Sequence, residues 1–171
     1  MTAFDIRIGH GFDVHAFEEA DACGKGVREL IIGGVHIPYP VGLEGHSDAD
    51  VLAHAVADAL LGAIRGGDIG KLFPDTDPAY AGADSMVLLA EVARVVREAG
   101  FEIAEVDSVI MAQAPKMSPY RDAMRERLAQ AMGIGVDNVG VKATTTEHLG
   151  FVGRKEGIAA SAVCLVRCCR S

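Results

Sequence analysis

Apolar and polar residues alternate at the start of the chain, and glycines and prolines punctuate the part that follows. The alternation from Phe4 to Ile8 predicts a strand with one buried face, and we expect Gly9 and Gly11 to interrupt it. The apolar stretch from Leu30 to Ile37 contains two central glycines, which predicts a hairpin with a tight turn. A loop is expected from Pro38 to Asp48, because proline disfavours regular strand pairing.

Three later segments repeat apolar residues at helical spacing. The first runs from Ala49 to Arg65, and either Ser47 or Asp48 can cap its start. The second is capped by Asp84 and runs to Ala99, where a glycine follows. The third has Ser118 as its expected N-cap, a proline in the first helical position, and an end at Gly133.

The remaining apolar runs predict further strands, at Val106–Gln113, Asn138–Ala143 and Ile158–Val166. Strands thus alternate with helices, but a hairpin is present too. We therefore expect one α+β domain over residues 1–171, with a mixed sheet packed on one face by helices. The last strand is apolar on both faces, so its second face is a candidate for burial against another subunit.

Composition and charge narrow the class of ligand. Half of the residues are hydrophobic, which is enough to build a core without disulfide or metal staples. The net charge of -8 argues against nucleic acid as the main ligand, because phosphate-backbone binding needs a basic face. Small phosphorylated ligands stay possible, since a metal ion and backbone amides can hold them locally.

The sequence predicts a soluble cytoplasmic protein with no membrane partner. Its first residues lack the pattern of a signal peptide, and the longest apolar stretch, Gly157 to Val166, is too short to span a bilayer. The cysteines form no CxxC pair, so we expect reduced thiols rather than a zinc cluster or a disulfide framework at Cys23, Cys164, Cys168 and Cys169.

One group of residues has the composition of a metal site. Asp13 and His15 stand two positions apart, and in an extended segment their side chains point to the same side. His54 in the first helix can supply a third ligand. Three protein ligands with a fourth position open are typical of catalytic zinc. The alternative is that each histidine is an ordinary hydrogen-bonded residue.

Two carboxylates flank His54 on the same face of the predicted helix. Asp50 precedes it by four residues and Asp58 follows it by four. A metal-bound histidine usually donates its other ring N–H to a carboxylate or carbonyl. Either aspartate can fill that role, and the sequence does not decide between them.

Several polar segments are candidates for binding phosphate, sugar or base. His46 and Ser47 precede a helix, whose N-terminal amides attract anions. The loop from Asp68 to Asp77 is rich in carboxylates that can bind sugar hydroxyls, and small residues at 112–117 would let a flat ring approach the backbone. Thr144–Glu147 offers hydroxyls and a carboxylate, which favour Mg²⁺ or Mn²⁺. A capped helix, plain turns and an ordinary strand edge are the alternatives.

Five motifs occur together and in a fixed order: RIGHGFDVH at 7–15, HSDAD at 46–50, GDIGKLFPDTD at 67–77, AQAPKM at 112–117 and VKATTTE at 141–147, the last followed by LGF at 149–151 and GR at 153–154. In these the chain resembles the 2-C-methyl-D-erythritol 2,4-cyclodiphosphate synthases of the non-mevalonate isoprenoid pathway. The resemblance spans nearly the whole chain. Departures are small: extra residues at 23–29, a variable segment at 118–121 and a tail at 168–171 with no functional counterpart.

The resemblance implies a role for each motif. Asp13, His15 and His54 match zinc ligands, and His46 and Thr145 match residues that stabilise the transition state. The substrate's methylerythritol phosphate would contact Asp13, Val14, His15, His46, Ser47, Asp68, Ile69, Gly70, Phe73, Pro74, Asp75, Thr76, Asp77, Phe151 and Arg154. The cytidine and its diphosphate would contact Ala112, Gln113, Ala114, Pro115, Lys116, Met117, Ser118, Thr144, Thr145, Thr146 and Glu147. Glu147 also matches the ligand of a Mg²⁺ or Mn²⁺ ion.

The implied reaction is an intramolecular phosphoryl transfer. The 2-phosphate of 4-diphosphocytidyl-2-C-methyl-D-erythritol 2-phosphate attacks its own β-phosphorus, CMP leaves, and a cyclic diphosphate forms. This is phosphorus–oxygen lyase chemistry, and it needs no protein nucleophile. The resemblance also implies a homotrimer with its sheets facing the three-fold axis and active sites between subunits.

Two other functions fit part of the pattern. A zinc phosphoesterase acting on a nucleotide diphosphate would use the same metal ligands, but it would activate a water molecule. A binding protein could instead hold an isoprenoid diphosphate inside the trimer, where Phe12 and Arg154 would suit such a ligand. Product analysis and activity without added isoprenoid distinguish these alternatives from the cyclase.

Overall fold

The structure is a computed structural model that describes residues 6–19, 23, 26, 28–74 and 82–169. In chain order the strands and helices are β1 (Ile6–Ala16), β2 (Leu30–Ile32), β3 (Val35–Ile37), α1 (Val51–Ile64), α2 (Ile69–Leu72), α3 (Ser85–Glu98), β4 (Phe101–Met111), α4 (Arg121–Met132), β5 (Val139–Thr144), α5 (Gly150–Gly153) and β6 (Gly157–Cys168). Short 3-10 turns occupy Ser118–Tyr120 and Val136–Asn138.

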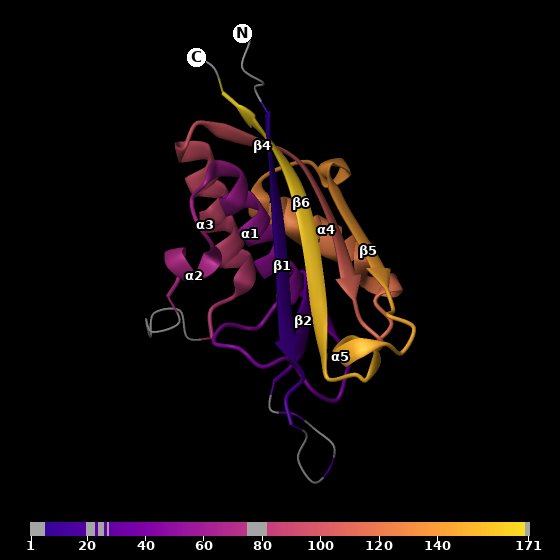
Figure 1. Ribbon diagram of the computed structural model, residues 1–171. Helices are drawn as coiled ribbons and strands as arrows, with labels where there is room; N and C mark the ends of the chain where they lie inside the picture. Colours follow the sequence, from indigo (N-terminus) through magenta and orange to yellow (C-terminus); the bar gives the residue numbers. More distant parts are fainter. Residues whose placement is uncertain (1–5, 20–22, 24–25, 27, 75–81, 170–171) are drawn as a thin grey trace.

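Four long strands form one mixed sheet in the order β1-β6-β4-β5 (Figure 1). β4 and β5 are parallel, whereas β6 is antiparallel to both β1 and β4. Helices α1, α3 and α4 lie on one face of this sheet (Figure 1). The predicted α+β architecture, with helices on one face of a mixed sheet, is therefore confirmed.

The other face of the sheet carries exposed apolar side chains. Along β1 every second residue is exposed, and the set includes Ile6, Ile8, Phe12 and Val14. Val163 extends this apolar surface onto β6, which pairs with β1. The strand alternation thus gives β1 one helix-facing side and one apolar open side.

β1 and α1 approach so closely that only glycine fits between them. A Cβ atom at Gly9 would lie 1.7 Å from the Ala59 carbonyl oxygen, and one at Gly11 would lie 2.0 Å from that of Ala55. The expectation that these glycines interrupt the strand is wrong, because β1 runs through both. They occupy its helix-facing side and let the helix backbone contact the sheet.

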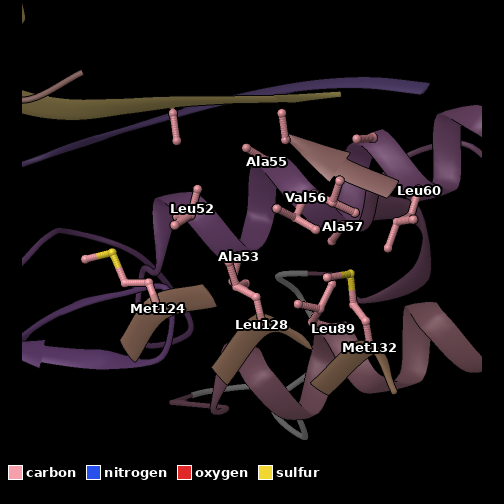
Figure 2. Packing of buried hydrophobic residues seen from close by; sticks show 14 of the residues in the cluster. Leu52, Ala53, Ala55, Val56, Ala57, Leu60, Leu89, Met124, Leu128 and Met132 are labelled. Carbon is pink, nitrogen blue, oxygen red and sulfur yellow. The ribbon is translucent and has the colours of Figure 1, made fainter. Parts of the chain in front are cut away.

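The core lies between the sheet and the helices. Figure 2 shows Ala55 of α1 on the side toward the strands, and Leu89 of α3 with Leu128 and Met132 of α4 on the opposite side. α1 is therefore buried on nearly all sides: ten of its 14 residues are buried, which explains why it contains so many alanines.

Several predicted boundaries need correction. Helix α1 begins at Val51 with Asp50 as its N-cap, not Ser47 or Asp48, and Ala49 has a positive φ of 57°. Ser118 does not cap the third helix, because a 3-10 turn precedes α4. β4 begins at Phe101 rather than Val106, since a shift in register at Ile103/Glu105 breaks the alternation that marks a strand.

The predicted hairpin is confirmed. The hairpin turn consists of Gly33 and Gly34, both with positive φ. Among the residues that the structure describes, Cys23, Cys164, Cys168 and Cys169 are thiols that form no disulfide. In the described part of the chain, no helix has both the length and the apolar character that crossing a bilayer requires.

The contact between β1 and α1 predicts a large difference between two glycine substitutions. Gly9→Ala should lower the free energy of unfolding by about 1–3 kcal/mol or more, because its methyl group collides with backbone. Gly62→Ala, on the exposed side of α1 with its nearest contact at 3.8 Å, should leave it unchanged or raise it by up to about 1 kcal/mol. Urea denaturation measures both, and equal stabilities would contradict this packing.

Candidate active site

The three predicted metal ligands converge on one point. Asp13 and His15 come from β1, and His54 comes from the first turn of α1. Asp13 Oδ2 lies 3.0 Å from His15 Nε2 and 3.1 Å from His54 Nδ1, and the two nitrogens are 3.2 Å apart. One oxygen and two nitrogens, all within 4.8 Å of one another, can hold a single metal ion.

The local sequence explains why these side chains meet. Gly9, Gly11, Asp13 and His15 follow one another at every second position, so all four face α1. The two glycines bring the helix against the strand, and His54 directly precedes Ala55, the residue that Gly11 contacts. The packing of the fold therefore sets the separation of the ligands.

Each histidine is held through its second ring nitrogen. The Nδ1 atom of His15 lies 2.5 Å from the carbonyl oxygen of Glu44. Because a carbonyl only accepts, Nδ1 donates and Nε2 is left to face Asp13. His54 is turned the other way: Nδ1 faces Asp13, and Nε2 lies 3.1 Å from Ser47 Oγ and 3.0 Å from Ser85 Oγ.

The electrostatics of the group suit a cation. Burial raises the pKa of Asp13, but hydrogen bonds and charge from His15 and His54 outweigh this and hold it below its usual range. Burial lowers the pKa of His15, yet the hydrogen bond and charge of Asp13 raise it overall. Asp13 is therefore ionised at neutral pH, as a metal ligand must be.

Neither Asp50 nor Asp58 holds the second nitrogen of His54, so that expectation is wrong. Asp50 is fully buried and accepts the N–H groups of Leu52 and Ala53, which makes it the cap of α1, and those of Gly33 and Gly34 in the hairpin turn. Burial raises its pKa to about 6. Asp58 Oδ1 instead accepts the Ile69 N–H at 2.7 Å, which anchors the start of α2.

Nine of the eleven predicted nucleotide-binding residues line a cavity of about 410 Å³, and Thr146 and Glu147 are not among them. The cavity lies where the parallel strands β4 and β5 end, a position at which α/β sheets commonly bind ligands. The Ala114–Pro115 peptide bond in its wall is cis. The lining consists of Ala112, Gln113, Ala114, Pro115, Lys116, Met117, Ser118, Ala143, Thr144 and Thr145.

The threonine segment continues from the cavity wall. Thr145 Oγ1 donates to Glu147 Oε1 at 2.8 Å, and the His148 N–H donates to the Gln113 side chain at 3.2 Å. Glu147 and His148 both have positive φ, so the chain turns sharply after Thr146. Thr145 and Glu147 are exposed. A hydroxyl and a carboxylate thus stand together beside the cavity.

The other predicted contacts are dispersed. His46 is exposed, whereas Ser47 is buried, and its carbonyl accepts from Arg28 Nη1 at 2.7 Å. Asp68 caps the short helix α2, which contains Ile69 and Gly70 and ends before Phe73 and Pro74. Arg154, after Phe151 in α5, pairs with Glu156. Asp75, Thr76 and Asp77 lie outside the described residues.

Sequence reasoning missed the groups that orient the two histidines. Ser85 is 31 residues from His54 in the chain, at the start of α3, and no motif connects them. Glu44 acts through its backbone carbonyl, so its side chain carries no signal. Only the packing of α3 against α1 reveals the contact of Ser85 with His54. Only the path of the loop before α1 reveals the contact of the Glu44 carbonyl with His15.

A mixed sheet with helices on one face, an Asp–His–His group and a cavity at the ends of two parallel strands define an α+β protein with a candidate metal centre and a separate candidate cavity for a small molecule. A family model described as the YgbB family matches residues 6–167. The chain belongs to this family, and the resemblance stated from its motifs is confirmed.

Known relatives cover the chain nearly completely. The 2-C-methyl-D-erythritol 2,4-cyclodiphosphate synthase of Bacillus cytotoxicus is 58% identical over 162 residues, which are 95% of this chain and 98% of that protein. The structure of Plasmodium falciparum IspF in a CDP complex has a TM-score of 0.82 at 31% identity, covering 99% of this chain and 100% of that one. The bifunctional IspDF of Campylobacter jejuni has a TM-score of 0.89 at 45% identity; the match covers 97% of this chain but 43% of that longer one.

The contacts of Asp58 predict that its charge is dispensable for metal binding. Asp58→Asn keeps an oxygen for the Ile69 N–H and leaves the hydrogen-bond partners of His54, which are Asp13, Ser47 and Ser85, in place. We expect metal affinity, measured by competition with a chelating dye, to change less than tenfold, which is about 1.4 kcal/mol. A larger loss in a correctly folded variant would restore Asp58 as a support of His54.

Proposed function

We propose that the chain converts 4-diphosphocytidyl-2-C-methyl-D-erythritol 2-phosphate to 2-C-methyl-D-erythritol 2,4-cyclodiphosphate with release of CMP. This is a step of non-mevalonate isoprenoid precursor biosynthesis. One combination of features carries the proposal: a three-residue candidate metal group, and a cavity lined by the AQAPKM motif and by Thr144 and Thr145. Both occur in a chain that is 58% identical to the 2-C-methyl-D-erythritol 2,4-cyclodiphosphate synthase of Bacillus cytotoxicus. The chain is an enzyme, and we assign it to the phosphorus–oxygen lyases because no water enters the product.

We propose zinc as the ion at Asp13, His15 and His54. A carboxylate oxygen and two imidazole nitrogens match its preferred donors, and three ligands leave a position for a phosphate oxygen. Bound there, zinc would act as Lewis acid and template for the β-phosphate. The chain's own contribution is to hold both imidazoles with their free nitrogens toward Asp13.

We propose that the cavity at the ends of β4 and β5 binds the cytidine diphosphate part of the substrate. The structure of the Plasmodium relative is a CDP complex, so cytidine diphosphate is a ligand of a protein to which this chain is similar. Ala112 and Ala114 are small, so a flat base can approach the backbone between them. Beside the cavity, Glu147 offers oxygen ligands to a Mg²⁺ or Mn²⁺ ion on the diphosphate.

The proposed catalytic groups are His46 and Thr145, which would donate hydrogen bonds to charge that develops on the transferring phosphate. Both are exposed and need no rearrangement of the core to reach a ligand. The methylerythritol phosphate would be held by the loop that follows α2 and by the region of Phe151 and Arg154. Positioning both phosphates can supply about 7–11 kcal/mol of the barrier reduction.

We further propose that residues 1–171 act as one cytoplasmic domain in a homotrimer with active sites between subunits. The apolar open face of β1, with Ile6, Ile8, Phe12 and Val14, supports an interior position around a three-fold axis. Such a face is unusual on a monomer, and a neighbouring subunit would cover it. Phe151 and Arg154 would then contact substrate across the subunit interface.

The direct test is incubation of the protein with the proposed substrate. We expect CMP and the cyclic diphosphate in equal amounts, without incorporation of ¹⁸O from labelled water, and loss of turnover after treatment with a strong chelator. Zinc should restore activity. Formation of a linear phosphate that carries ¹⁸O would instead identify a phosphoesterase and refute the proposal.

His54→Ala should abolish zinc binding and lower kcat by at least about a hundredfold, because a Lewis acid contributes several kcal/mol. His36→Ala is the matched control, since His36 is an exposed residue of β3 outside the metal group. Zinc content by mass spectrometry and turnover are measured on the same samples. Full activity of a zinc-free His54→Ala protein would disprove the assigned metal role.

Glu147→Gln should raise the concentration of Mg²⁺ or Mn²⁺ needed for half-maximal activity by about tenfold or more, because an amide is a weaker ligand than a carboxylate. Zinc binding should be unchanged. Glu126→Gln, in the exposed part of α4, is the control. If the wild type, Glu147→Gln and Glu126→Gln needed the same concentration of Mg²⁺ for half-maximal activity, Glu147 would not be the ligand.

A further inference from the structure

A chain of hydrogen bonds leads from His54 to a carboxylate that no motif connects with it. His54 Nε2 lies 3.0 Å from Ser85 Oγ, and Ser85 Oγ lies 2.5 Å from Asp48 Oδ1. The backbone N–H of Ser85 donates to the other carboxylate oxygen, Asp48 Oδ2, at 3.0 Å. Three segments, the loop before α1, α1 itself and the start of α3, therefore meet behind the metal group.

The direction of each hydrogen bond follows from the inventory of protons. The Asp48 carboxylate can only accept, so the single hydroxyl proton of Ser85 points to Asp48. Ser85 Oγ can then only accept from His54, which requires the proton of the imidazole to be on Nε2. In the neutral imidazole, which is the form that ligates a metal, His54 Nδ1 then carries no proton, and this is the atom that faces Asp13 and His15.

We propose that Asp48 and Ser85 are positioning residues of the metal centre. Asp48 fixes the hydroxyl proton of Ser85, and Ser85 fixes His54 as the tautomer that presents Nδ1 to the metal. The inference rests on the metal site assigned under the proposed function. A ligating histidine usually donates directly to a carboxylate. Here Ser85 stands between His54 and the Asp48 carboxylate.

Burial makes this contact effective. Ser85 is 1% exposed and the side chain of His54 is 13% exposed, so solvent is largely excluded from the hydrogen bond. Ser47 Oγ is the second oxygen near Nε2, at 3.1 Å, and it accepts the Ala49 N–H at 3.2 Å. The Ser85 hydroxyl proton is directed to the Asp48 carboxylate, whereas no carboxylate of the described residues directs the hydroxyl proton of Ser47. Ser85 is therefore the group that decides the tautomer of His54.

Among the described residues, the hydrogen bonds of the Ser85 hydroxyl are those to Asp48 and His54. Helix α3 is already capped by Asp84, which accepts the Met86 N–H at 2.8 Å. The backbone N–H of Ser85 ties α3 to Asp48 whatever the side chain is. Removing the hydroxyl should therefore leave the helix in place and remove the link from Asp48 to His54.

The test compares two buried serines. Ser85→Ala should weaken Zn²⁺ binding about 10–100-fold, which is typical for loss of a partner of a metal ligand. Ser108→Ala is the matched control, because Ser108 is 2% exposed and its hydroxyl donates one hydrogen bond, to Gly140 O at 2.8 Å. Zn²⁺ affinity is measured by competition with a chelator, alongside unfolding by urea.

A merely structural role predicts the opposite pattern. Both variants would then lose stability and keep wild-type affinity for Zn²⁺, which would overturn the inference. Asp48→Asn should also weaken Zn²⁺ binding, and in the double variant with Ser85→Ala the two losses should be less than additive. Independent, additive losses would show that Asp48 does not act through Ser85.

The wild-type protein supplies a readout that does not depend on any variant. In ¹⁵N NMR spectra of the zinc-loaded protein we expect His54 to bind the metal through Nδ1 and keep its proton on Nε2, with His15 the reverse. Coordination of His54 through Nε2 would overturn the inference while leaving the metal site intact. A wild-type protein that bound no Zn²⁺ would overturn the proposed metal site and the inference with it.

Discussion

The direct contact of the β1 backbone with α1 is the constraint on which the rest of the structure depends. Gly9 and Gly11 leave no side chain between strand and helix. A methyl group at either position would collide with the carbonyl oxygen of Ala59 or Ala55. The same alternation that directs these glycines toward α1 directs Asp13 and His15 toward it further along the strand. Fold packing and metal-ligand geometry are therefore consequences of one run of residues.

A second constraint fixes the position of α1 along the strand. The fully buried Asp50 carboxylate accepts N–H groups from the helix it caps and from Gly33 and Gly34 in the hairpin turn. Burial disfavours its charge, and these N–H donors offset part of that cost. Because the start of α1 is held in this way, His54, one helical turn after Asp50, is fixed at the position along β1 where it meets Asp13.

The two functional regions use different parts of the sheet. The metal group lies between β1 and α1, whereas the cavity lies at the ends of the parallel pair β4 and β5. Strand β6 separates the two and pairs with β1 and β4 along its length. One sheet thus carries the candidate metal centre and the proposed nucleotide site, and the exposed Thr145–Glu147 segment stands on the cavity side.

The sequence by itself determined the three long helices, most strands, the hairpin and the three candidate metal ligands, because periodicity, glycine turns and residue chemistry are local properties. It did not determine where α1 begins, since Asp48 and Asp50 are both good caps and only the hairpin turn selects Asp50. It misread Gly9 and Gly11 as breaks, because a strand glycine shows its purpose only when the opposing helix is in place. Tertiary structure alone decided what supports His54: Ser85 is distant in the chain, and its hydroxyl becomes a partner only when α3 packs against α1.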